Sequence, residues 1–156
     1  MRGVVQRVTF ARVRVGEELV AEIGMGLLLY LGVGPSDDGR VAARMAQRLS
    51  RLRIFADEMG RMNRSLLEAE GEALVVSQFT LFADSRRGHR PSFLGAAPPD
   101  LGRELCLLVA DELRRQGVLR VAEGRFGANM TVQAANQGPV TVVVTSGEGD
   151  WRADCG

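Results

Sequence analysis

The segment ALVVSQFTLF, Ala73 to Phe82, begins as an apolar strand and then carries the polar side chains of Ser77, Gln78 and Thr80. Burying polar groups without partners costs free energy, so this run needs hydrogen-bond partners or a ligand. Period-two alternation places Gln78 and Thr80 on one face of the strand. The pattern alone favours an edge strand with ordinary polar residues. The alternative is a strand end that lines a pocket.

Elements on both sides of this segment alternate between strand and helix. The apolar run Leu27 to Val33, bounded by glycines, predicts a strand buried on both faces. Apolar residues at helical spacing after Pro35-Ser36-Asp37 predict a helix capped by Ser36 or Asp37, with this stripe: Val41, Met45, Leu49 and Leu52. A second helix is expected from Pro98-Pro99-Asp100 to Gly117.

Further strands are expected in several shorter segments. The pattern predicts a hairpin around Gly16-Glu17 and a last strand pair joined at Gly138-Pro139. The ranges are 2–10, 11–15, 19–23, 53–55, 118–122, 130–135 and 140–145. The mixture of strands and two long helices indicates an α/β class.

Composition limits the protein class. A chain of 156 residues can form one domain with a substantial core, and 46% hydrophobic residues are ordinary for a globular protein. No apolar run approaches the ~20 residues that span a bilayer, and no signal-peptide core follows Met1. We therefore expect a cytoplasmic protein. Cys106, Cys155 and His89 make neither a disulfide framework nor a usual metal site, so no metal and no cofactor are expected.

Every one of the 20 basic residues is arginine, which excludes Schiff-base chemistry and a Walker-type lysine. The net charge of +1 is too small for general capture of nucleic acid, so RNA contact requires a local patch. One candidate is the loop containing Arg86, Arg87 and Arg90. The first predicted helix carries a second group, which we interpret as a solvated face: Arg40, Arg44, Arg48 and Arg51.

A side-chain nucleophile is a further hypothesis. Ser77 or Thr80 could attack, with His89 as base and Asp84 as its orienting partner. No glycine elbow surrounds Ser77, and the arginines around His89 suit phosphate contact equally well. Thr80 is the better candidate because the strand pattern places it beside Gln78. From the residues alone, a side-chain nucleophile is the less favoured hypothesis.

A second motif, Asn136-Gln137-Gly138-Pro139-Val140-Thr141, follows further along the chain. Together with Ser77-Gln78-Phe79-Thr80-Leu81 and the start Met1-Arg2, it makes the chain resemble the D-aminoacyl-tRNA deacylases. These are small homodimeric enzymes that remove D-amino acids wrongly esterified to tRNA. The resemblance implies a layered α/β/β domain with a mixed, barrel-like sheet and two main helices. It implies one domain over residues 1–145 and a flexible tail over 146–156.

The resemblance also assigns roles to residues. It implies metal-independent hydrolysis of D-aminoacyl-tRNA, and of glycyl-tRNA, at a site containing Ser77, Gln78, Phe79 and Thr80. The backbone N–H groups near Phe79 and the Gln78 amide would hold the terminal adenosine and the reacting carbonyl. The resemblance further implies that Arg86, Arg87 and Arg90 bind tRNA. It also implies that Arg7 supports the second motif.

Gly138-Pro139 receives the most specific role. In the family resembled, this dipeptide is cis and reaches into the partner subunit's pocket, where its carbonyl oxygens exclude L-amino acids. From the residues alone, a hairpin turn with a trans bond remains the alternative. Two other functions stay open: a related editing hydrolase that removes a small L-amino acid from tRNA, and a non-catalytic RNA-binding module.

Overall fold

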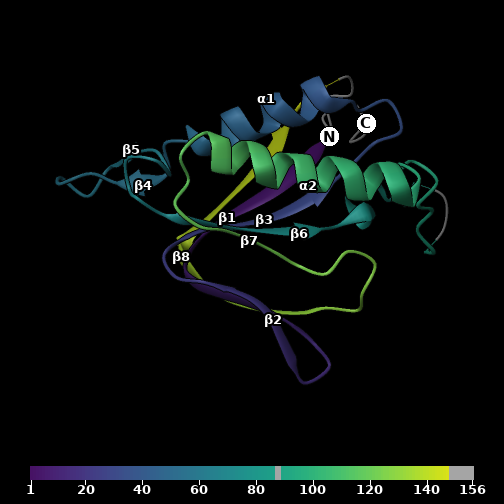
Figure 1. Ribbon diagram of the computed structural model, residues 1–156, viewed down its shortest axis with the longest axis horizontal. Coiled ribbons are helices and arrows are strands. Elements are labelled where there is room, and N and C mark those ends of the chain that lie inside the picture. Colours follow the sequence, from purple (N-terminus) through teal and green to yellow (C-terminus); the bar gives the residue numbers. More distant parts are fainter. Residues whose placement is uncertain (87–88, 148–156) are drawn as a thin grey trace.

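Two helices lie on one side of a strongly curved sheet in the computed structural model, which describes residues 1–86 and 89–147 (Figure 1). In chain order the elements are β1 (Arg2–Val15), β2 (Glu18–Ile23), β3 (Gly26–Gly32), α1 (Gly39–Ser50), β4 (Phe55–Ala56), β5 (Met62–Arg64), β6 (Glu72–Ser77), a 3₁₀ turn η1 (Phe79–Phe82), α2 (Pro99–Arg115), β7 (Val121–Glu123) and β8 (Thr131–Thr145). This arrangement confirms the expected α/β class, with a mixed, barrel-like sheet and two main helices.

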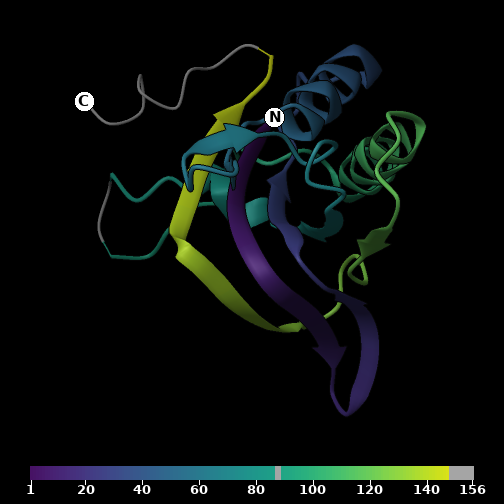
Figure 2. The ribbon, with the colours of Figure 1, turned by 90° about the vertical axis from the view of Figure 1, so that its left-hand side faces the viewer.

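The long strand β1 organises the sheet. One of its edges pairs with β8 from Arg2↔Thr145 to Arg14↔Thr131. Its other edge pairs first with β3 and then, beyond a change of partner, with β2. The remaining neighbours, β3–β6 and β6–β7, are parallel. Because β1 serves two different partners along one edge, the sheet curls, and Figure 2 shows β1 and β8 following this curve together.

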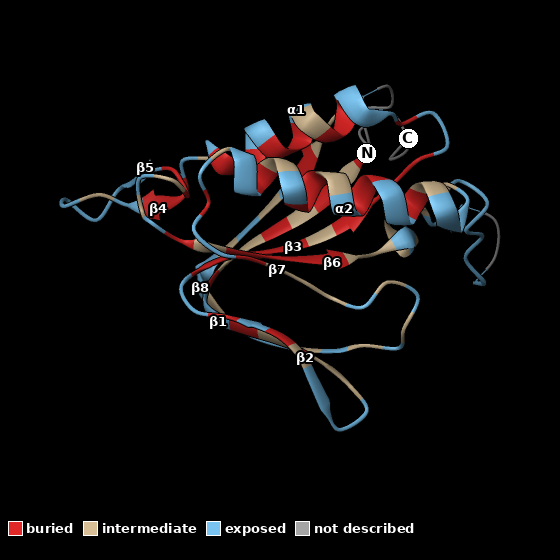
Figure 3. Ribbon diagram, in the orientation of Figure 1, coloured by how far each residue is buried: buried red, intermediate tan, exposed pale blue. Residues whose placement is uncertain are grey.

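The core has two parts, one on each face of the sheet. Leu27, Leu29 and Leu31 of β3 pack toward α1 and α2. Leu28 of β3 faces the other way, into a smaller cluster with Val8 and Leu74. The prediction of a strand buried on both faces is thus confirmed, and Figure 3 shows β3 buried under the helices.

The helices depart from their predicted ends in detail. Asp38, rather than Ser36 or Asp37, caps α1, because its carboxylate accepts the N–H of Val41 at 2.9 Å. Asp37 is instead buried, where it accepts hydrogen bonds from the Met1 amino group at 2.6 Å and from Gly34 N–H at 2.7 Å. Leu52 lies beyond the end of α1 but still packs on the core. The predicted start of α2 is confirmed, and the chain leaves it through Gly117, at φ +98°.

Several predicted strand boundaries are wrong. Residues 2–10 and 11–15 form one continuous strand, since β1 keeps its pairing with β8 through both ranges. Instead of the single strand expected at 53–55, the chain forms a short hairpin, in which β4 starts at Phe55 and pairs with β5. The strand expected at 118–122 begins at Val121, where pairing with Ala73 of β6 starts. The turn at Gly16-Glu17 between β1 and β2 is confirmed.

Two corrections bear directly on the site. The strand expected over 73–82 ends at Ser77, and Phe79–Phe82 turns into a 3₁₀ helix, so Gln78 and Thr80 do not share a strand face. The predicted strand pair 130–135 and 140–145 is instead the single strand β8. Both its halves pair with β1, so Gly138-Pro139 is not a hairpin turn.

The end of the described chain is held against its beginning. Ser146 N–H donates to the Met1 carbonyl at 3.0 Å, and the Met1 amino group donates to the Ser146 carbonyl at 2.8 Å. The rest of the tail expected over 146–156, from residue 148 onward, lies outside the described residues. Within residues 1–86 and 89–147, no helix combines the length and apolar character needed to cross a membrane.

The β3–β6 pairing leaves no room for a side chain at Gly26. A Cβ there would lie 1.9 Å from the Glu72 carbonyl oxygen, which is backbone and cannot rotate away. We expect Gly26→Ala to lower the free energy of unfolding by about 3 kcal/mol or more. Gly24→Ala is the matched control, because the nearest atom to its Cβ would be the Glu72 Oε2 at 3.9 Å. Urea unfolding measures both variants, and equal stabilities would contradict this close approach.

Candidate active site

The Ser77-to-Thr80 motif lies where β6 leaves the sheet. Ser77 is the last residue of β6 and pairs with Leu31 of β3. The N–H of Gln78 then donates to the Leu31 carbonyl at 2.8 Å, and the chain turns into η1. The polar residues therefore sit at a strand end and in a turn, and not inside a strand, which removes the burial penalty that the sequence pattern implied.

The turn is held by contacts from the start of β1. Arg2 Nη1 donates to the Leu81 carbonyl at 3.1 Å. The same guanidinium lies 4.5 Å from the centre of the Phe82 ring, at cation–π distance. Within the turn, Leu81 N–H donates to the Gln78 carbonyl at 3.2 Å, and the Gln78 side-chain amide donates to Thr80 Oγ1. These contacts position Gln78 and Thr80 relative to the sheet.

A cavity of about 450 Å³ opens beside this turn. Its described walls include three of the four residues predicted as catalytic, namely Ser77, Gln78 and Phe79, but not Thr80. The opposite wall is a loop that the sequence analysis did not assign. The full lining is Val76, Ser77, Gln78, Phe79, Pro99, Phe126, Gly127, Ala128, Asn129, Met130 and Val132.

Little in the sequence indicated that this loop would form the opposite wall of the cavity. The loop contains Phe126 between Gly124 and Gly127, and Gly127 has a φ of +76°. Two glycines around an aromatic residue were the available signal. Phe79 of the first wall is exposed and meets the ring of Phe93 edge-on, with centroids 5.2 Å apart.

Gly138-Pro139 lies in an irregularity of β8. Gln6 pairs with Thr141 and Val8 with Asn136, so residues 137–140 lie opposite Arg7 alone. We call these four residues the Gly-Pro bulge. The Gly138-Pro139 peptide bond is cis, as the resemblance implied, and both residues are exposed.

Side chains at the base of the Gly-Pro bulge hold it in place through hydrogen bonds. Asn136 Nδ2 donates to Thr141 Oγ1 at 3.0 Å, and Asn136 Oδ1 accepts the N–H of Val140 at 3.2 Å. Arg7 Nε donates to the Gln137 carbonyl at 3.3 Å. Arg7 Nη1 also donates to the Ile54 carbonyl at 2.5 Å, which ties the bulge to the segment before β4. Arg7 thus lies where a support for the bulge was predicted.

One arginine of the predicted RNA-contact loop already has a carboxylate partner. Arg86 pairs with Asp84 through two hydrogen bonds of 2.9 and 2.8 Å. The Asp84 carboxylate is therefore already paired with Arg86, which weakens the hypothesis that Asp84 orients His89. Arg90 and His89 are exposed, and Arg87 lies outside the described residues.

Another nucleophilic side chain in this region is Cys106, on α2. It borders a smaller cavity of about 200 Å³ that also touches Ser77. Burial, together with nearby Glu123, raises the pKa of the Cys106 thiol to about 12, so it is neutral at physiological pH. No three His, Cys, Asp or Glu side chains within residues 1–86 and 89–147 gather as metal ligands would.

Comparison with known proteins places this geometry in a family. Residues 4–145 match the family described as D-Tyr-tRNA(Tyr) deacylase. A D-aminoacyl-tRNA deacylase of Roseiflexus sp. (strain RS-1) is 58% identical over 146 residues, covering 94% of each chain. The chain therefore belongs to the D-Tyr-tRNA(Tyr) deacylase family, and the resemblance drawn from the two motifs is confirmed.

Two solved structures share the fold. One, titled c-Myc DNA Unwinding Element Binding Protein, has a TM-score of 0.88 and 36% identity, covering 94% of this chain and 99% of its own. The other is described as a probable eukaryotic D-amino acid tRNA deacylase. It has a TM-score of 0.81 and 18% identity, covering 92% of this chain and 97% of its own.

Proposed function

We propose that this protein hydrolyses the ester bond of D-aminoacyl-tRNA and releases the free D-amino acid and tRNA. The observation that carries the proposal is a cavity walled by Ser77, Gln78 and Phe79 in a chain that matches the deacylase family over residues 4–145. At about 450 Å³ the cavity falls within the usual range for small ligands. We place the protein in the cytoplasm, where aminoacyl-tRNA is used.

The chemistry requires little beyond positioning. An aminoacyl ester is already activated, and the terminal ribose carries a neighbouring hydroxyl. Hydrogen-bond donors that face the developing oxyanion can then supply most of the catalysis. The Gln78 amide and the backbone N–H groups at the start of η1 fill this role. The described cavity lining contains no histidine, carboxylate or thiol, which supports hydrolysis without a side-chain base.

Chiral selection is assigned to the Gly-Pro bulge acting across a homodimer. Gly138 and Pro139 are exposed and are not among the residues that line the cavity of their own chain. A bulge that projects from an edge of the sheet can instead enter the cavity of a second copy. Its carbonyl oxygens would face the substrate's α-amino group and fill the space that an L side chain needs. Glycine would pass this filter.

Contact with tRNA near the site is assigned to the loop of Arg86, Arg87 and Arg90. Arg90 is exposed, whereas the charge of Arg86 is offset by Asp84. Arg90 is therefore the stronger contributor among the two that the structure describes.

A second candidate function, nucleic-acid binding without catalysis, is favoured by one observation. The similar structure at 36% identity is titled as a DNA-element-binding protein. A third, removal of a small L-amino acid from tRNA, uses the same cavity with a different filter. The three functions differ in which esters are cleaved.

The first test is a panel of tRNA esters. We expect cleavage of D-tyrosyl- and D-aspartyl-tRNA, partial cleavage of glycyl-tRNA and almost none of L-tyrosyl-tRNA, because a backbone filter ignores side-chain identity. Single-turnover release of the amino acid measures each rate, and EDTA should leave the rates unchanged. Binding of tRNA without cleavage would favour the second function, and preferred cleavage of a small L-ester would favour the third.

The role of Thr80 can be tested directly. Its hydroxyl is held by the Gln78 amide and is not part of the described cavity wall. We expect Thr80→Ala to keep kcat within about tenfold of the wild type, while Gln78→Ala loses about 10²-fold or more as a missing oxyanion donor. A loss of about 10³-fold in Thr80→Ala, with substrate binding intact, would restore Thr80 as the nucleophile.

Gly138→Ala should disable the filter. A Cβ there would lie 2.8 Å from Val140 Cγ2 and 3.1 Å from Arg7 Nη2, at a φ of +121° that alanine resists. We expect cleavage of D-tyrosyl-tRNA to fall by about 10²-fold, because the positioned carbonyls shift. Gly16→Ala is the matched control, since that glycine also has positive φ but has open space around it. It should retain full activity.

The same variant tests action across subunits. Mixed with Gln78→Ala under subunit exchange, Gly138→Ala should regain activity, because a mixed dimer contains one intact cavity facing one intact bulge. Random exchange predicts recovery to about a quarter of the wild-type rate. No recovery in a mixture shown to contain mixed dimers would mean that bulge and cavity act within one chain.

A further inference from the structure

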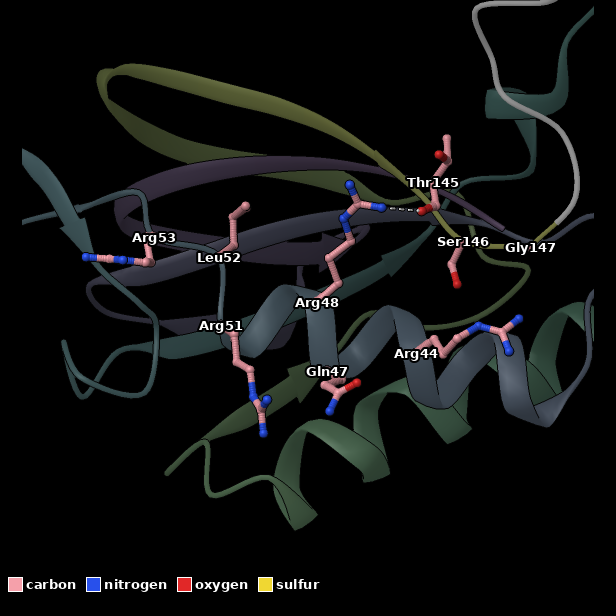
Figure 4. Close-up of a pocket in the computed structure, with 9 residues that line it drawn as sticks. All are labelled: Arg44, Gln47, Arg48, Arg51, Leu52, Arg53, Thr145, Ser146 and Gly147. Carbon is pink, nitrogen blue, oxygen red and sulfur yellow. Dashed lines mark hydrogen bonds between the residues drawn. The ribbon is translucent and has the colours of Figure 1, made fainter.

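An arginine-lined groove runs between the exposed face of α1 and the end of β8 (Figure 4). It has a volume of about 920 Å³ and is lined by Arg44, Arg48, Arg51, Arg53 and residues 145–147, among others. We call it the arginine groove. Three of these arginines belong to the stripe interpreted above as a solvated face. The fourth stripe member, Arg40, pairs with Asp38 instead.

The arginine groove carries positive charge that its own lining does not offset. Outside the lining, Glu68 interacts electrostatically with Arg53. Within residues 1–86 and 89–147, none of its four arginines forms an ion pair, and no acidic residue is in its lining. Elsewhere several arginines pair with acids, as in Arg114 with Glu123 or Arg125 with Glu18. A chain of net charge +1 thus concentrates unmatched cations along one groove.

Two of the four arginines also have structural roles. Arg48 Nη1 donates to the Thr145 carbonyl at 3.0 Å, and Arg53 Nε donates to the Asn63 carbonyl at 2.6 Å. Arg44 and Arg51 are exposed, and the side chain of neither makes a hydrogen bond to another described residue. Their long side chains are therefore available to an external anion.

The spread of the guanidinium groups indicates what kind of anion fits. Figure 4 shows Arg48 reaching toward Thr145 and Arg51 pointing away from it. Arg44 and Arg53 lie at opposite ends, so the guanidinium groups have no common point of convergence. Arg44 and Arg51 are seven residues apart on α1 and its cap, or about 10 Å along the helix axis. One strand of duplex DNA carries a phosphate about every 3.4 Å, so a nucleic-acid backbone along α1 would present several phosphates to the arginine groove. A polyanion suits this arrangement better than a single small anion.

The arginine groove is connected to the Gly-Pro bulge by a short series of contacts. Arg53, at one end of the groove, precedes Ile54, whose carbonyl accepts from Arg7 Nη1. The same Arg7 donates through Nε to the Gln137 carbonyl in the Gly-Pro bulge. The side chain of Arg7 therefore links the Gly-Pro bulge to the segment that carries one end of the arginine groove.

We infer that the arginine groove binds the phosphate backbone of the tRNA whose 3′ end occupies the partner subunit's cavity. The inference rests on the proposed function, since it takes the cavity and bulge to act on aminoacyl-tRNA across a dimer. Each subunit would then supply the bulge and a phosphate track for its partner's substrate. The loop of Arg86, Arg87 and Arg90 would contact the 3′ end itself.

The test compares Arg44→Gln/Arg51→Gln with the wild type. The Kd for uncharged tRNA is measured between 50 and 200 mM salt, and thermal unfolding verifies the fold. We expect about tenfold weaker binding and a salt slope smaller by one to two, as for the loss of two phosphate contacts. On D-tyrosyl-tRNA, KM should rise while kcat is unchanged. On D-tyrosyl-adenosine, which has no phosphate track, kcat/KM should stay at the wild-type value.

Arg14→Gln/Arg120→Gln is the charge-matched control. Arg14 lies at the end of β1 beside the β1–β2 turn, and Arg120 just before β7, so neither lines the arginine groove. It should bind tRNA nearly as tightly as the wild type. Equal losses in both double variants, wild-type binding in the groove variant, or an equal loss on D-tyrosyl-adenosine would each overturn the inference.

The design separates this inference from the proposed function. If the wild type cleaves no D-aminoacyl ester, the proposed function fails. Binding of uncharged tRNA still reports whether the arginine groove holds the RNA backbone. If cleavage occurs normally but the groove variant keeps its Kd and salt slope, the function stands and the inference fails.

Discussion

Hydrogen bonding of β1 along both edges is the constraint on which the rest of the structure depends. β8 follows one edge almost from end to end, while the other edge is shared by β3 and β2. The sheet twists and curls along β1, so the two ends of this strand face different neighbours. The curl produces two apolar spaces, one filled under α1 and α2 and the other inside the sheet.

The same pairing explains why the Gly-Pro bulge exists as a defined shape. Four residues of β8 stand opposite Arg7, so their backbone groups lose their partners in the ladder. Asn136 and Arg7 supply substitutes by bonding the Val140 N–H and the Gln137 carbonyl. A bulge fixed in this way re-aims backbone groups away from the sheet, which is how irregular strands commonly serve functional sites. The shape of this bulge depends on register as much as on residue type.

A further feature of the structure is the way its charged side chains are distributed. Arginine provides all 20 of the Lys and Arg side chains, and several arginines pair with carboxylates at surface positions such as Arg114–Glu123. Such pairs contribute little to stability on their own. Their effect is to leave the arginine groove beside α1 as a region of unmatched positive charge, although the net charge of the chain is only +1. Local distribution, and not net charge, therefore decides where positive charge is concentrated on the surface.

Sequence pattern predicted the elements whose burial is regular. The apolar run of β3, the stripe of α1 and the proline start of α2 each reflect a packing period that is visible in the residues themselves. The two motifs also identified the family and one part of the cavity wall, at Ser77, Gln78 and Phe79.

Tertiary structure decided what depends on distant partners. Local pattern could not show that β6 ends at Ser77, because η1 is held by Arg2 and by the carbonyl of Leu31. It could not distinguish a hairpin at Gly138-Pro139 from a bulge, because both satisfy the same local turn chemistry and differ only in pairing with β1. It could not place Phe126 across from Gln78, or Arg53 beside the helix arginines. Residues far apart in sequence are brought together by the curl of the sheet, and that curl is set by hydrogen bonds between strands rather than by any one segment.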